Sequence, residues 1–269
     1  MATPLVFGVL NVTADSFSDG GKYINTSRAI EHALSMVEAG ADVVDIGGES
    51  TRPGAERVEA AVEQDRVLPV IEALVNNGVK VSLDTMRAST AQCGINLGVA
   101  FINDVSGGKA DAEMFPTVAA SQVDYIAMHW RGHSDVMNSL ATYGDVTKEV
   151  IAELMEQVAK AQASGIDARR IVIDPGFGFA KDAEQNWELL RNLNAFAQLP
   201  HRVLVGVSRK RFLAATVSAD APVEARDMAT HAISVYCATK KAWAVRVHDV
   251  AGTVAALKVA TELMGDRHV

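Results

Sequence analysis

The chain has 269 residues, of which 49% are hydrophobic and 22% charged, a composition close to that of an average globular protein. This composition argues against disorder and against a collagen-like fibre. The formal net charge of −8 argues against broad binding of nucleic acid or anionic membrane surfaces, although a few local cations can still hold an anionic substrate.

The cysteines and the first residues bear on where the protein works. Cys93 and Cys237 fit no metal-binding spacing, and a single disulfide would add little stability to a chain of this length. We therefore expect two reduced, buried thiols. The opening residues, MATPLVFGVLNVT, lack a basic region and a small-residue cleavage site. No apolar run approaches the roughly 20 residues that span a membrane. We expect a cytoplasmic protein without a membrane segment.

Short runs rich in Val and Ile alternate with longer stretches of helical period. Eight of the short runs predict strands: residues 5–13, 42–48, 79–85, 101–107, 125–130, 171–176, 203–209 and 244–249. Strands that alternate with helices indicate parallel βαβ units, and no linker divides the chain. The sequence therefore predicts an α/β fold, a single (β/α)8 TIM barrel that occupies residues 1–269 as one domain.

The stretches between these strands carry signals for helix ends. In the first stretch, Thr26 or Ser27 is a candidate N-cap and Gly40 a candidate end. Asp182 is a candidate cap for a later helix. Pro69 lies inside the second helical stretch and predicts either a kink or a division from a loop that begins near residue 54.

Polar side chains collect at the C-terminal ends of the predicted strands, the face of a (β/α)8 barrel where active sites lie. They are Asn11, Asp84, Asn103, Asp104, Asp174, Ser208, Arg209, Lys210, Arg246, His248 and Asp249. Any one of them is explained equally well by a helix cap or a turn, and for Asp104 and Asp249 we expect no more than that. So many on one face predict a common cavity.

The chemical types in this set predict a cavity with two different sides. Carboxylates and a carboxamide accept and donate hydrogen bonds in a pattern that suits an amino-pyrimidine edge, whereas cations suit a diphosphate. The first group is Asp84, Asn103 and Asp174, and the second is Lys210, Arg246 and His248. We expect an acidic floor for a flat heterocycle and a cationic rim for phosphate.

Motifs of other enzyme classes are missing or incomplete in the sequence. There is no Walker A motif, no HExxH and no paired CxxC. GFGFAK, from Gly176, ends in Lys where the dinucleotide fingerprint needs Gly or Ala, and GVSRK, from Gly206, lacks the last Gly of a nucleophile elbow. His129 ends the fifth strand, and whether it is a ligand stays open. The remaining histidines outside the candidate set are expected to be ordinary surface or core residues: His32, His133, His201, His231 and His268.

Seven stretches make the chain resemble the dihydropteroate synthase family of pterin-binding barrels from Leu5 to about Met264. They are GVLNVTADSFSDGG, DIGGESTRPGA, SLDTMR, INDVSGG, DPGFGFAK, GVSRKRFL and VRVHDV, in the family's order and spacing. The resemblance implies that 6-hydroxymethyl-7,8-dihydropterin diphosphate condenses with p-aminobenzoate by an SN1-like mechanism in folate biosynthesis. It also implies a homodimer. Because the STRPG and SRKR stretches are intact, we expect sensitivity to sulfonamide inhibitors.

The resemblance also implies a role for each matching residue. The implied catalytic residues, which hold the pterin ring and the diphosphate, are Asp84, Asp174, Lys210, Arg246 and His248. The implied substrate contacts are Asn103, Phe17, Asp19, Thr51, Arg52, Pro53, Met128, Phe179, Gly206 and Arg211. Asn11 is the implied ligand of Mg²⁺, a cation that prefers oxygen and often meets the protein through few ligands.

Two alternatives from other classes share the barrel. A pterin-binding methyltransferase needs the acidic pterin site but no diphosphate contacts, so Lys210, Arg246 and His248 together favour the synthase. A non-catalytic paralogue would keep the barrel for binding alone, yet every implied functional position holds a suitable residue.

Overall fold

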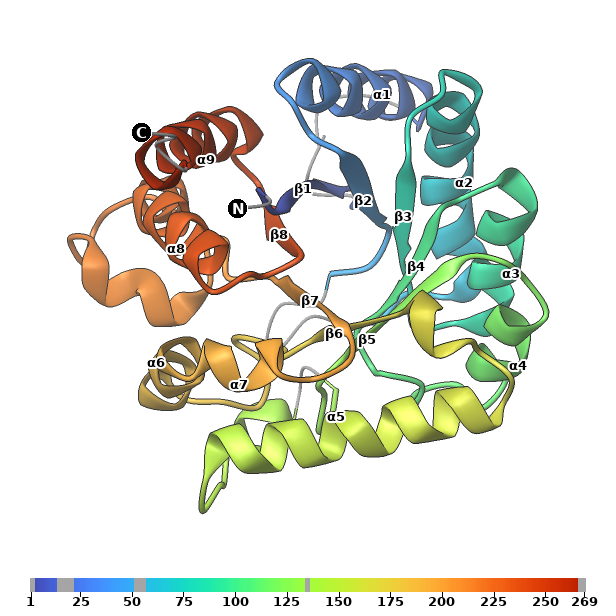
Figure 1. Cartoon of the computed structure of the whole chain (residues 1–269). Helices are drawn as coiled ribbons and strands as arrows, with labels where there is room; N and C mark the ends of the chain where they lie inside the picture. Colours follow the sequence, from blue (N-terminus) through green and yellow to red (C-terminus); the bar gives the residue numbers. More distant parts are fainter. Residues whose placement is uncertain (1–2, 14–21, 51–56, 134–135, 266–269) are drawn as a thin grey trace.

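The strands form a closed parallel barrel. The computed structural model describes residues 3–13, 22–50, 57–133 and 136–265. Within these ranges the strands are β1 (Leu5–Asn11), β2 (Val43–Gly47), β3 (Val81–Asp84), β4 (Phe101–Asp104), β5 (Asp124–Met128), β6 (Ile171–Asp174), β7 (Arg202–Val205) and β8 (Ala244–Val247). Each strand pairs in parallel with the next, and β8 pairs with β1 (Figure 1). The predicted eight strands and the (β/α)8 architecture are confirmed.

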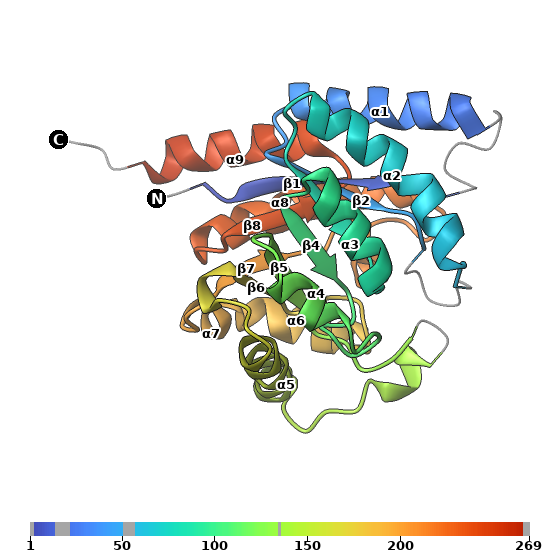
Figure 2. The same cartoon turned by 90° about the vertical axis from the view of Figure 1, so that its right-hand side faces the viewer.

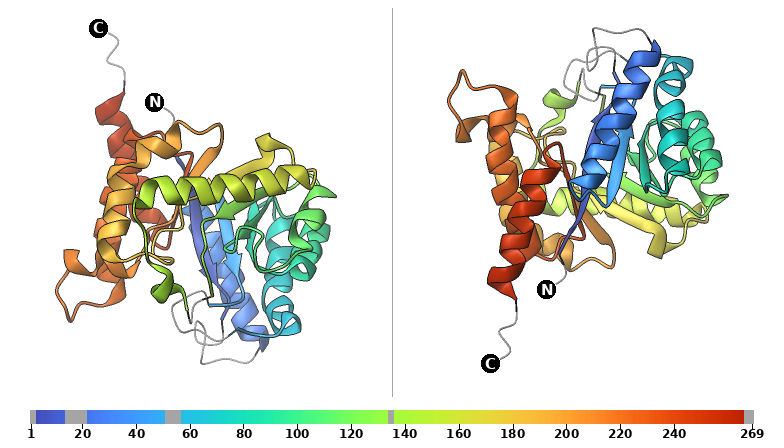
Figure 3. Two further views of the ribbon diagram at one scale, coloured as in Figure 1. Left: turned by 90° about the horizontal axis from the view of Figure 1, so that it is seen from below. Right: turned by 90° about the horizontal axis from the view of Figure 1, so that it is seen from above.

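Helices surround the barrel. The α-helices are α1 (Lys22–Glu38), α2 (Ala60–Asn76), α3 (Ala88–Leu97), α4 (Met114–Ala119), α5 (Val146–Ala163), α6 (Ala183–Arg191), α7 (Leu193–Ala197), α8 (Asp227–Thr239) and α9 (Val250–Met264). Short 3-10 segments are η2 (Met137–Leu140), η3 (Ala168–Arg170), η4 (Arg211–Thr216) and η5 (Val223–Arg226). In Figure 3, α5 covers one side of the barrel, and α1 and α9 cover the opposite side. No helix in the described ranges is long and apolar enough to cross a lipid bilayer.

The predicted helix starts were right for one helix and wrong for another. Asp182 caps α6: its side chain accepts from the Gln185 backbone N–H, and the Gln185 side chain accepts in turn from the Asp182 N–H, both at 2.8 Å. Helix α1 already begins at Lys22, so Thr26 and Ser27 lie inside it and cap nothing. The apolar spacing of this segment begins after Ser27, so it could not predict the helical residues that precede Thr26.

Two further signals concern helix continuity. Helix α1 stops at Glu38, and Gly40 follows with a φ of 102°, as predicted. Pro69 lies inside α2, which runs from Ala60 to Asn76, so the predicted division there was wrong. The buried face of α2 carries Val67 and Val70 on either side of Pro69, and this packing keeps the helix together although the proline cannot donate a backbone hydrogen bond.

All eight strands run in one direction, so their C-terminal ends share one face of the barrel. In Figure 2, β1 starts and α9 ends on the left of the molecule, whereas η2, which follows β5, lies on the right. The face on the right is therefore the one on which the candidate residues gather.

The lower half of the barrel interior is apolar. There Phe7 meets Phe101 edge-on at a centroid distance of 5.4 Å, and it meets Trp243 at 5.7 Å. The buried residues of this cluster, called the apolar layer below, are Phe7, Val43, Phe101, Ile126, Val172, Leu204 and Ala244. These side chains fill the barrel, so any site must lie above them, toward the C-terminal ends of the strands.

Candidate active site

A second layer of interior side chains lies directly above the apolar layer. Side chains on a strand alternate between its faces, so residues two positions further along also point into the barrel. This layer, called the polar layer below, comprises Val9, Asp45, Asn103, Met128, Asp174, Gly206 and Arg246. On β2, β4, β6 and β8 the interior therefore changes from a hydrocarbon side chain to a polar or charged one within two residues.

Arg246 is the centre of the polar layer. Its Nη2 donates to Asp174 Oδ2 at 3.0 Å, and its Nε lies 3.7 Å from Asp45 Oδ2. Asn103 Nδ2 donates to the same Asp45 oxygen at 3.1 Å. The side chain of Arg246 is only 10% exposed, and a Cβ at position 206 would lie 2.9 Å from its Nη2, so Gly206 leaves room for the guanidinium.

These contacts both confirm and correct the expected geometry. Asp174 and Arg246, 72 positions apart in sequence, do meet inside the barrel, where they form a hydrogen bond. However, we expected Arg246 on a cationic rim, and it lies in the acidic floor instead. Its position in β8 explains this, because Ala244 belongs to the apolar layer and Arg246 follows it two residues later on the same interior face.

Asp45 was missed by the sequence analysis. It is 2% exposed, and burial raises its pKa, although the nearby Arg246 acts in the opposite direction. The signal that would have found it is the alternation in DVVDIGG, because Asp45 stands two residues after the interior Val43. Asp45 therefore joins the candidate site as a third carboxylate.

Asp84 and Asn11 flank Gly47 at the ends of three adjacent strands. Gly47 pairs with Asp84 on β3 and with Asn11 on β1. The pKa of Asp84 lies well above its usual value, because burial and the Asp45 carboxylate both disfavour its charge, while Arg246 partly offsets them. Asp84 thus interacts electrostatically with the polar layer, as predicted.

Lys210 approaches the site from the segment after β7. Its Nζ lies 4.0 Å from the centroid of the Phe179 ring, a cation–π contact. Burial and the positive charge of Arg246 lower the pKa of Lys210 to about 7, although Asp174 and Asp84 act the other way. The two residues that were expected to contact different substrates are therefore in contact with each other.

Some polar atoms in the polar layer are buried and have no hydrogen-bond partner among the described residues. Asn103 Oδ1 is one such acceptor, and Arg246 Nη1 is one such donor group. Leaving a buried polar group unpaired costs about 1–3 kcal/mol, so a ligand that both donates and accepts is favoured here. The edge of an amino-pyrimidine has this pattern.

The remaining candidates lie near the rim or outside the described ranges. His248 follows β8, and Ser208 Oγ lies 3.0 Å from its Nδ1 and accepts from its backbone N–H at 3.1 Å. Met128 is buried in the polar layer, whereas Arg211 begins η4 and is exposed. The candidates that fall outside the described residues are Phe17, Asp19, Thr51, Arg52 and Pro53.

Asp104 and Asp249 serve the fold, as expected. Asp104 accepts from the Tyr125 hydroxyl at 2.8 Å and from the Ser106 hydroxyl at 2.6 Å. Asp249 caps α9 by accepting from the Gly252 N–H at 3.1 Å. Neither contact leaves the carboxylate directed at the cavity.

Arg209 is a correction to the predicted set. It has a φ of 59° and turns outward, where its Nε and Nη2 donate to both Asp227 carboxylate oxygens at 2.9 and 2.8 Å. β7 ends at Val205, so strand alternation no longer governs position 209. Arg209 holds the connection to α8 and leaves the cavity to Lys210.

His129 is not directed at the cavity. It follows the interior Met128, so its side chain points to the outer face of β5, where it is 2% exposed. There its Nε2 lies 3.0 Å from Glu153 Oε2 and its Nδ1 lies 2.9 Å from Lys181 Nζ. In the described structure, the contacts of His129 are with protein side chains behind the site.

Cys93 also differs from expectation, because it is half-buried rather than buried.

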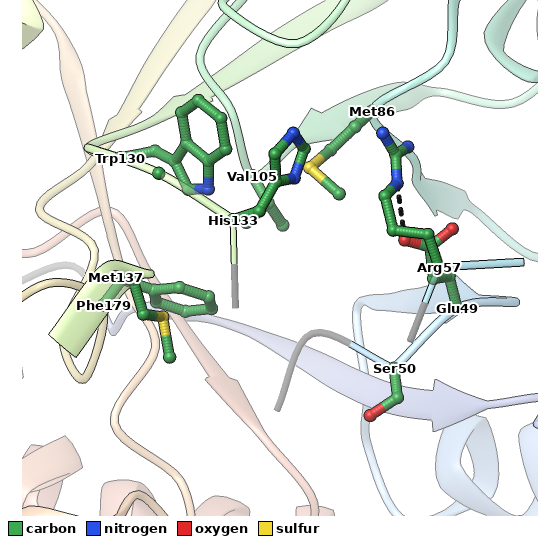
Figure 4. A pocket seen from close by; sticks show the side chains of 10 residues that line it. Glu49, Ser50, Arg57, Met86, Val105, Trp130, His133, Met137 and Phe179 are labelled. Carbon is green, nitrogen blue, oxygen red and sulfur yellow. Dashed lines mark hydrogen bonds and ion pairs between the residues drawn. The ribbon is translucent and has the colours of Figure 1, made fainter. Parts of the chain in front are cut away.

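The segments that follow five of the strands line a hollow at the mouth of the barrel (Figure 4). Trp130, Met137 and Phe179 lie on one side in Figure 4, and the Arg57–Glu49 ion pair of 3.1 Å lies on the other. The rest of the lining is Ser50, Met86, Val105, Gly132 and His133. His133, expected to be an ordinary histidine, therefore borders this hollow, whose apolar side suits an aromatic ring.

Asn11 is the predicted protein ligand of Mg²⁺. Within the described residues, no group of three or more His, Cys, Asp and Glu side chains is placed to hold a metal ion. The carboxamide oxygen of Asn11 is a suitable oxygen ligand for Mg²⁺, which commonly takes one or two protein ligands and completes its shell with phosphate oxygens and water. The carboxamide oxygen of Asn11 is thus compatible with this ion, and the Mg²⁺ site stays a prediction.

The barrel, its polar layer and the aromatic mouth define a (β/α)8 enzyme whose pocket suits a flat, polar heterocycle. A family model described as pterin binding enzyme matches residues 7–248. The dihydropteroate synthase of Mycobacterium leprae is 47% identical over 264 residues, which cover 96% of this chain and 93% of that protein. The chain therefore belongs to the pterin-binding enzymes and, within them, to the dihydropteroate synthase family.

Solved structures agree with this assignment. The Xanthomonas albilineans dihydropteroate synthase with 4-aminobenzoic acid superposes with a TM-score of 0.91 at 39% identity, covering 98% of this chain and 94% of that one. The Yersinia pestis dihydropteroate synthase with a sulfonamide drug complex gives a TM-score of 0.90 at 35% identity, covering 97% and 94%. The family and the barrel expected from the sequence are confirmed.

Proposed function

We propose that this chain condenses 6-hydroxymethyl-7,8-dihydropterin diphosphate with p-aminobenzoate to give 7,8-dihydropteroate and diphosphate in folate biosynthesis. The observation that carries the proposal is the contact of Arg246 with Asp174 inside the polar layer, beside Asp45 and Asn103. A relative with 4-aminobenzoic acid and another with a sulfonamide support the choice of substrate and inhibitor class.

The acidic floor would bind the pterin ring. Asp174, Asp84 and Asn103 would hydrogen-bond its amino and ring N–H groups, with Asp45 adjacent, and Lys210 would donate to the ring's oxygen and nitrogen edge. As the carbon–oxygen bond to diphosphate breaks, positive charge spreads from the methylene group into the ring. The fixed carboxylates stabilise that charge, which favours an SN1-like step.

The leaving group would be held by the cations at the strand ends. Arg246 and His248 are the proposed diphosphate contacts. Asn11 would hold Mg²⁺, and the ion would supply positive charge that stabilises the leaving group.

The arylamine is neutral and nucleophilic near pH 7, so it needs positioning more than activation. Phe179, at the mouth of the barrel, and Arg211, at the start of η4, are the proposed borders of its site. We infer ordered binding with pterin diphosphate first, because the second site lies above the polar layer. A sulfonamide, which resembles the arylamine, is expected to compete for it.

A diphosphate-release assay tests the proposal. Purified protein, Mg²⁺ and the pterin diphosphate should release diphosphate only when p-aminobenzoate is added, and a sulfonamide should reduce the rate. Methyl transfer from a methylated folate, without diphosphate release, would favour the methyltransferase alternative. Binding of pterin without either reaction would favour a non-catalytic paralogue.

The proposal includes a homodimer in the cytoplasm. Large apolar side chains are exposed on the neighbouring helices α8 and α9: Met228 is 74%, Val259 59% and Leu263 80% exposed. The two free cysteines are in keeping with a reducing compartment. Light scattering on the purified chain should give twice the mass of 28.6 kDa, and a monomer at all concentrations would contradict the dimer.

A further inference from the structure

The loop from Pro175 to Lys181, called the β6 loop below, has an unusual backbone for a segment that carries a site residue. Gly176 and Gly178 have φ values of 68° and 77°, and Ala180 has a φ of 47° although it carries a Cβ. A Cβ at position 176 would lie 2.2 Å from the carbonyl oxygen of His129, so the loop is pressed against the end of β5. Such a conformation persists only where its surroundings hold it.

Lys181 supplies much of that hold from inside. Its side chain is buried, with 7% exposed, and its ammonium group folds back into the loop. The Nζ donates to the carbonyl oxygens of Gly176 at 3.0 Å and Phe179 at 2.9 Å, and it contacts His129 Nδ1 at 2.9 Å. Burial lowers the pKa of Lys181 to about 7, and in the charged form its three donors match three acceptors, two of them in the loop itself.

The protonation of His129 fits this arrangement. Burial and the charge of Lys181 lower the pKa of His129 to about 3, so the imidazole is neutral. A neutral imidazole has one donor and one acceptor, and Nδ1 must accept here because the ammonium can only donate. Nε2–H then donates to Glu153 Oε2, which lies 3.0 Å away.

Glu153 is fixed in turn by Arg131. The guanidinium donates from Nη2 to Glu153 Oε1 at 2.5 Å, and its carbon lies 3.8 Å from the centroid of the Tyr143 ring. The Tyr143 hydroxyl donates to the Ala180 carbonyl oxygen at 2.9 Å. Charged and polar groups from the β5–α5 connection and α5 thus reach the β6 loop from behind the barrel.

The β6 loop presents Phe179 to the cavity. The ring of Phe179 lines the mouth of the barrel and lies 4.0 Å from the Nζ of Lys210. Because Lys181 binds the carbonyl oxygen of Phe179 directly, removal of its ammonium frees the backbone that carries this ring. The ammonium itself does not face the cavity, so it has no place among the groups that touch substrate.

We propose that Lys181 is a positioning residue for the second substrate: its ammonium group, oriented by His129 and Glu153, fixes the β6 loop so that Phe179 forms one wall of the arylamine site. The proposal rests on the proposed synthase activity for its kinetic readout. In this proposal His129 orients Lys181 and does not bind a ligand.

Steady-state kinetics of Lys181→Met test the proposal. The KM for p-aminobenzoate and the dissociation constant of a sulfonamide should both rise on the order of ten-fold, as expected for loss of hydrogen bonds from a charged donor. The KM for the pterin diphosphate should stay within about two-fold, because the hydrogen bonds of Lys181 Nζ are to His129 and to the β6 loop and not to polar-layer side chains. Lys160→Met, which removes an exposed lysine on α5, is the matched control and should resemble the unmodified chain.

Two variants of His129 keep the test informative if Lys181→Met folds poorly. His129→Gln retains an acceptor for Lys181 and a donor for Glu153, so it should stay near the unmodified chain. His129→Leu retains neither and should raise the KM for p-aminobenzoate in the same direction as Lys181→Met. The double variant with His129→Leu and Lys181→Met should raise the KM for p-aminobenzoate no more than Lys181→Met alone, because both substitutions remove the same contact.

Hydrogen exchange separates this proposal from the proposed activity. The Phe179 amide, which donates to the Gly176 carbonyl oxygen at 3.1 Å, should exchange faster in Lys181→Met whether or not the chain is a synthase. Unchanged exchange in the β6 loop together with an unchanged KM for p-aminobenzoate would overturn the proposal. Equal losses for both substrates, with a lowered melting temperature, would show a merely structural role and overturn it as well. An unmodified chain that releases no diphosphate would refute the activity alone.

Discussion

The two layers inside the barrel lie two residues apart along the strands and differ in their chemistry. Phe7, Val172 and Ala244 fill the lower interior, whereas Asp174 and Arg246, each two residues after an apolar-layer residue, form an ion pair. Burial of the lower layer drives folding and needs only volume and shape. The upper layer keeps charged groups at a face that substrate can reach. Stability and function are therefore separated along the barrel axis, and substitutions in the two layers should have different consequences.

The largest effect on stability is expected in the apolar layer. Phe7→Ala removes an aromatic ring from a site with no exposed surface, and it should lower the free energy of unfolding by about 3–5 kcal/mol. Denaturant titration measures this loss. Turnover per folded molecule should stay within about two-fold, and a large loss of turnover in folded protein would mean that the two layers are not separable.

The largest effect on activity is expected in the polar layer. Arg246→Ala and Asp84→Ala should each lower turnover by roughly 10²–10³-fold, as is typical when one preorganised charged contact is removed. Diphosphate release by purified, folded protein is the measurement. Near-normal turnover in either variant would refute the role proposed for that residue.

A smaller effect is expected from pH, through Lys210. Its pKa is lowered to about 7 by burial and by Arg246, so the ammonium is charged below this pH and loses its proton as the pH rises through it. Because kcat/KM reports the free enzyme, its value for the pterin diphosphate should fall with a slope of about one log unit per pH unit on the alkaline side. Lys210→Arg stays charged and should abolish this inflection. Lys181→Met, which removes another lysine whose pKa is lowered to about 7, should retain it.

The smallest effect is expected at a helix end away from both layers. Asp182→Ala removes the cap of α6 and should cost about 1 kcal/mol of unfolding free energy, with no change in turnover. Thermal or denaturant unfolding measures this difference. Asp182→Asn keeps a capping side chain and should recover most of the loss, so an equal cost for both variants would argue against the cap.

The sequence predicted the barrel well because strand and helix periods are local properties. Each of the eight strands has its own apolar run, and the polar residues at their ends indicated the functional face. The same alternation that placed Asp174 in the cavity also places Asp45 there, although DVVDIGG was treated only as a strand. That residue was predictable from its spacing to Val43.

Other features of the site depend on long-range contacts that no local pattern contains. The outward turn of Arg209 follows from its pairing with Asp227 on α8, and the contacts of His129 are with Glu153 on α5 and Lys181 after β6. Strand alternation places Arg246 inside the barrel, but its partners Asp45 and Asp174 lie on two other strands. A local sequence pattern reports only on residues that are near one another along the chain. The contacts of these side chains are with residues far away in the sequence.

Gly206 has no side chain, and this leaves the space that the guanidinium of Arg246 occupies. A methyl group there would lie 2.9 Å from Nη2 of Arg246, so the guanidinium would have to shift from its place beside the carboxylate of Asp174. Because the guanidinium is the far end of a flexible side chain, we expect an alanine here to disturb this pairing rather than the fold.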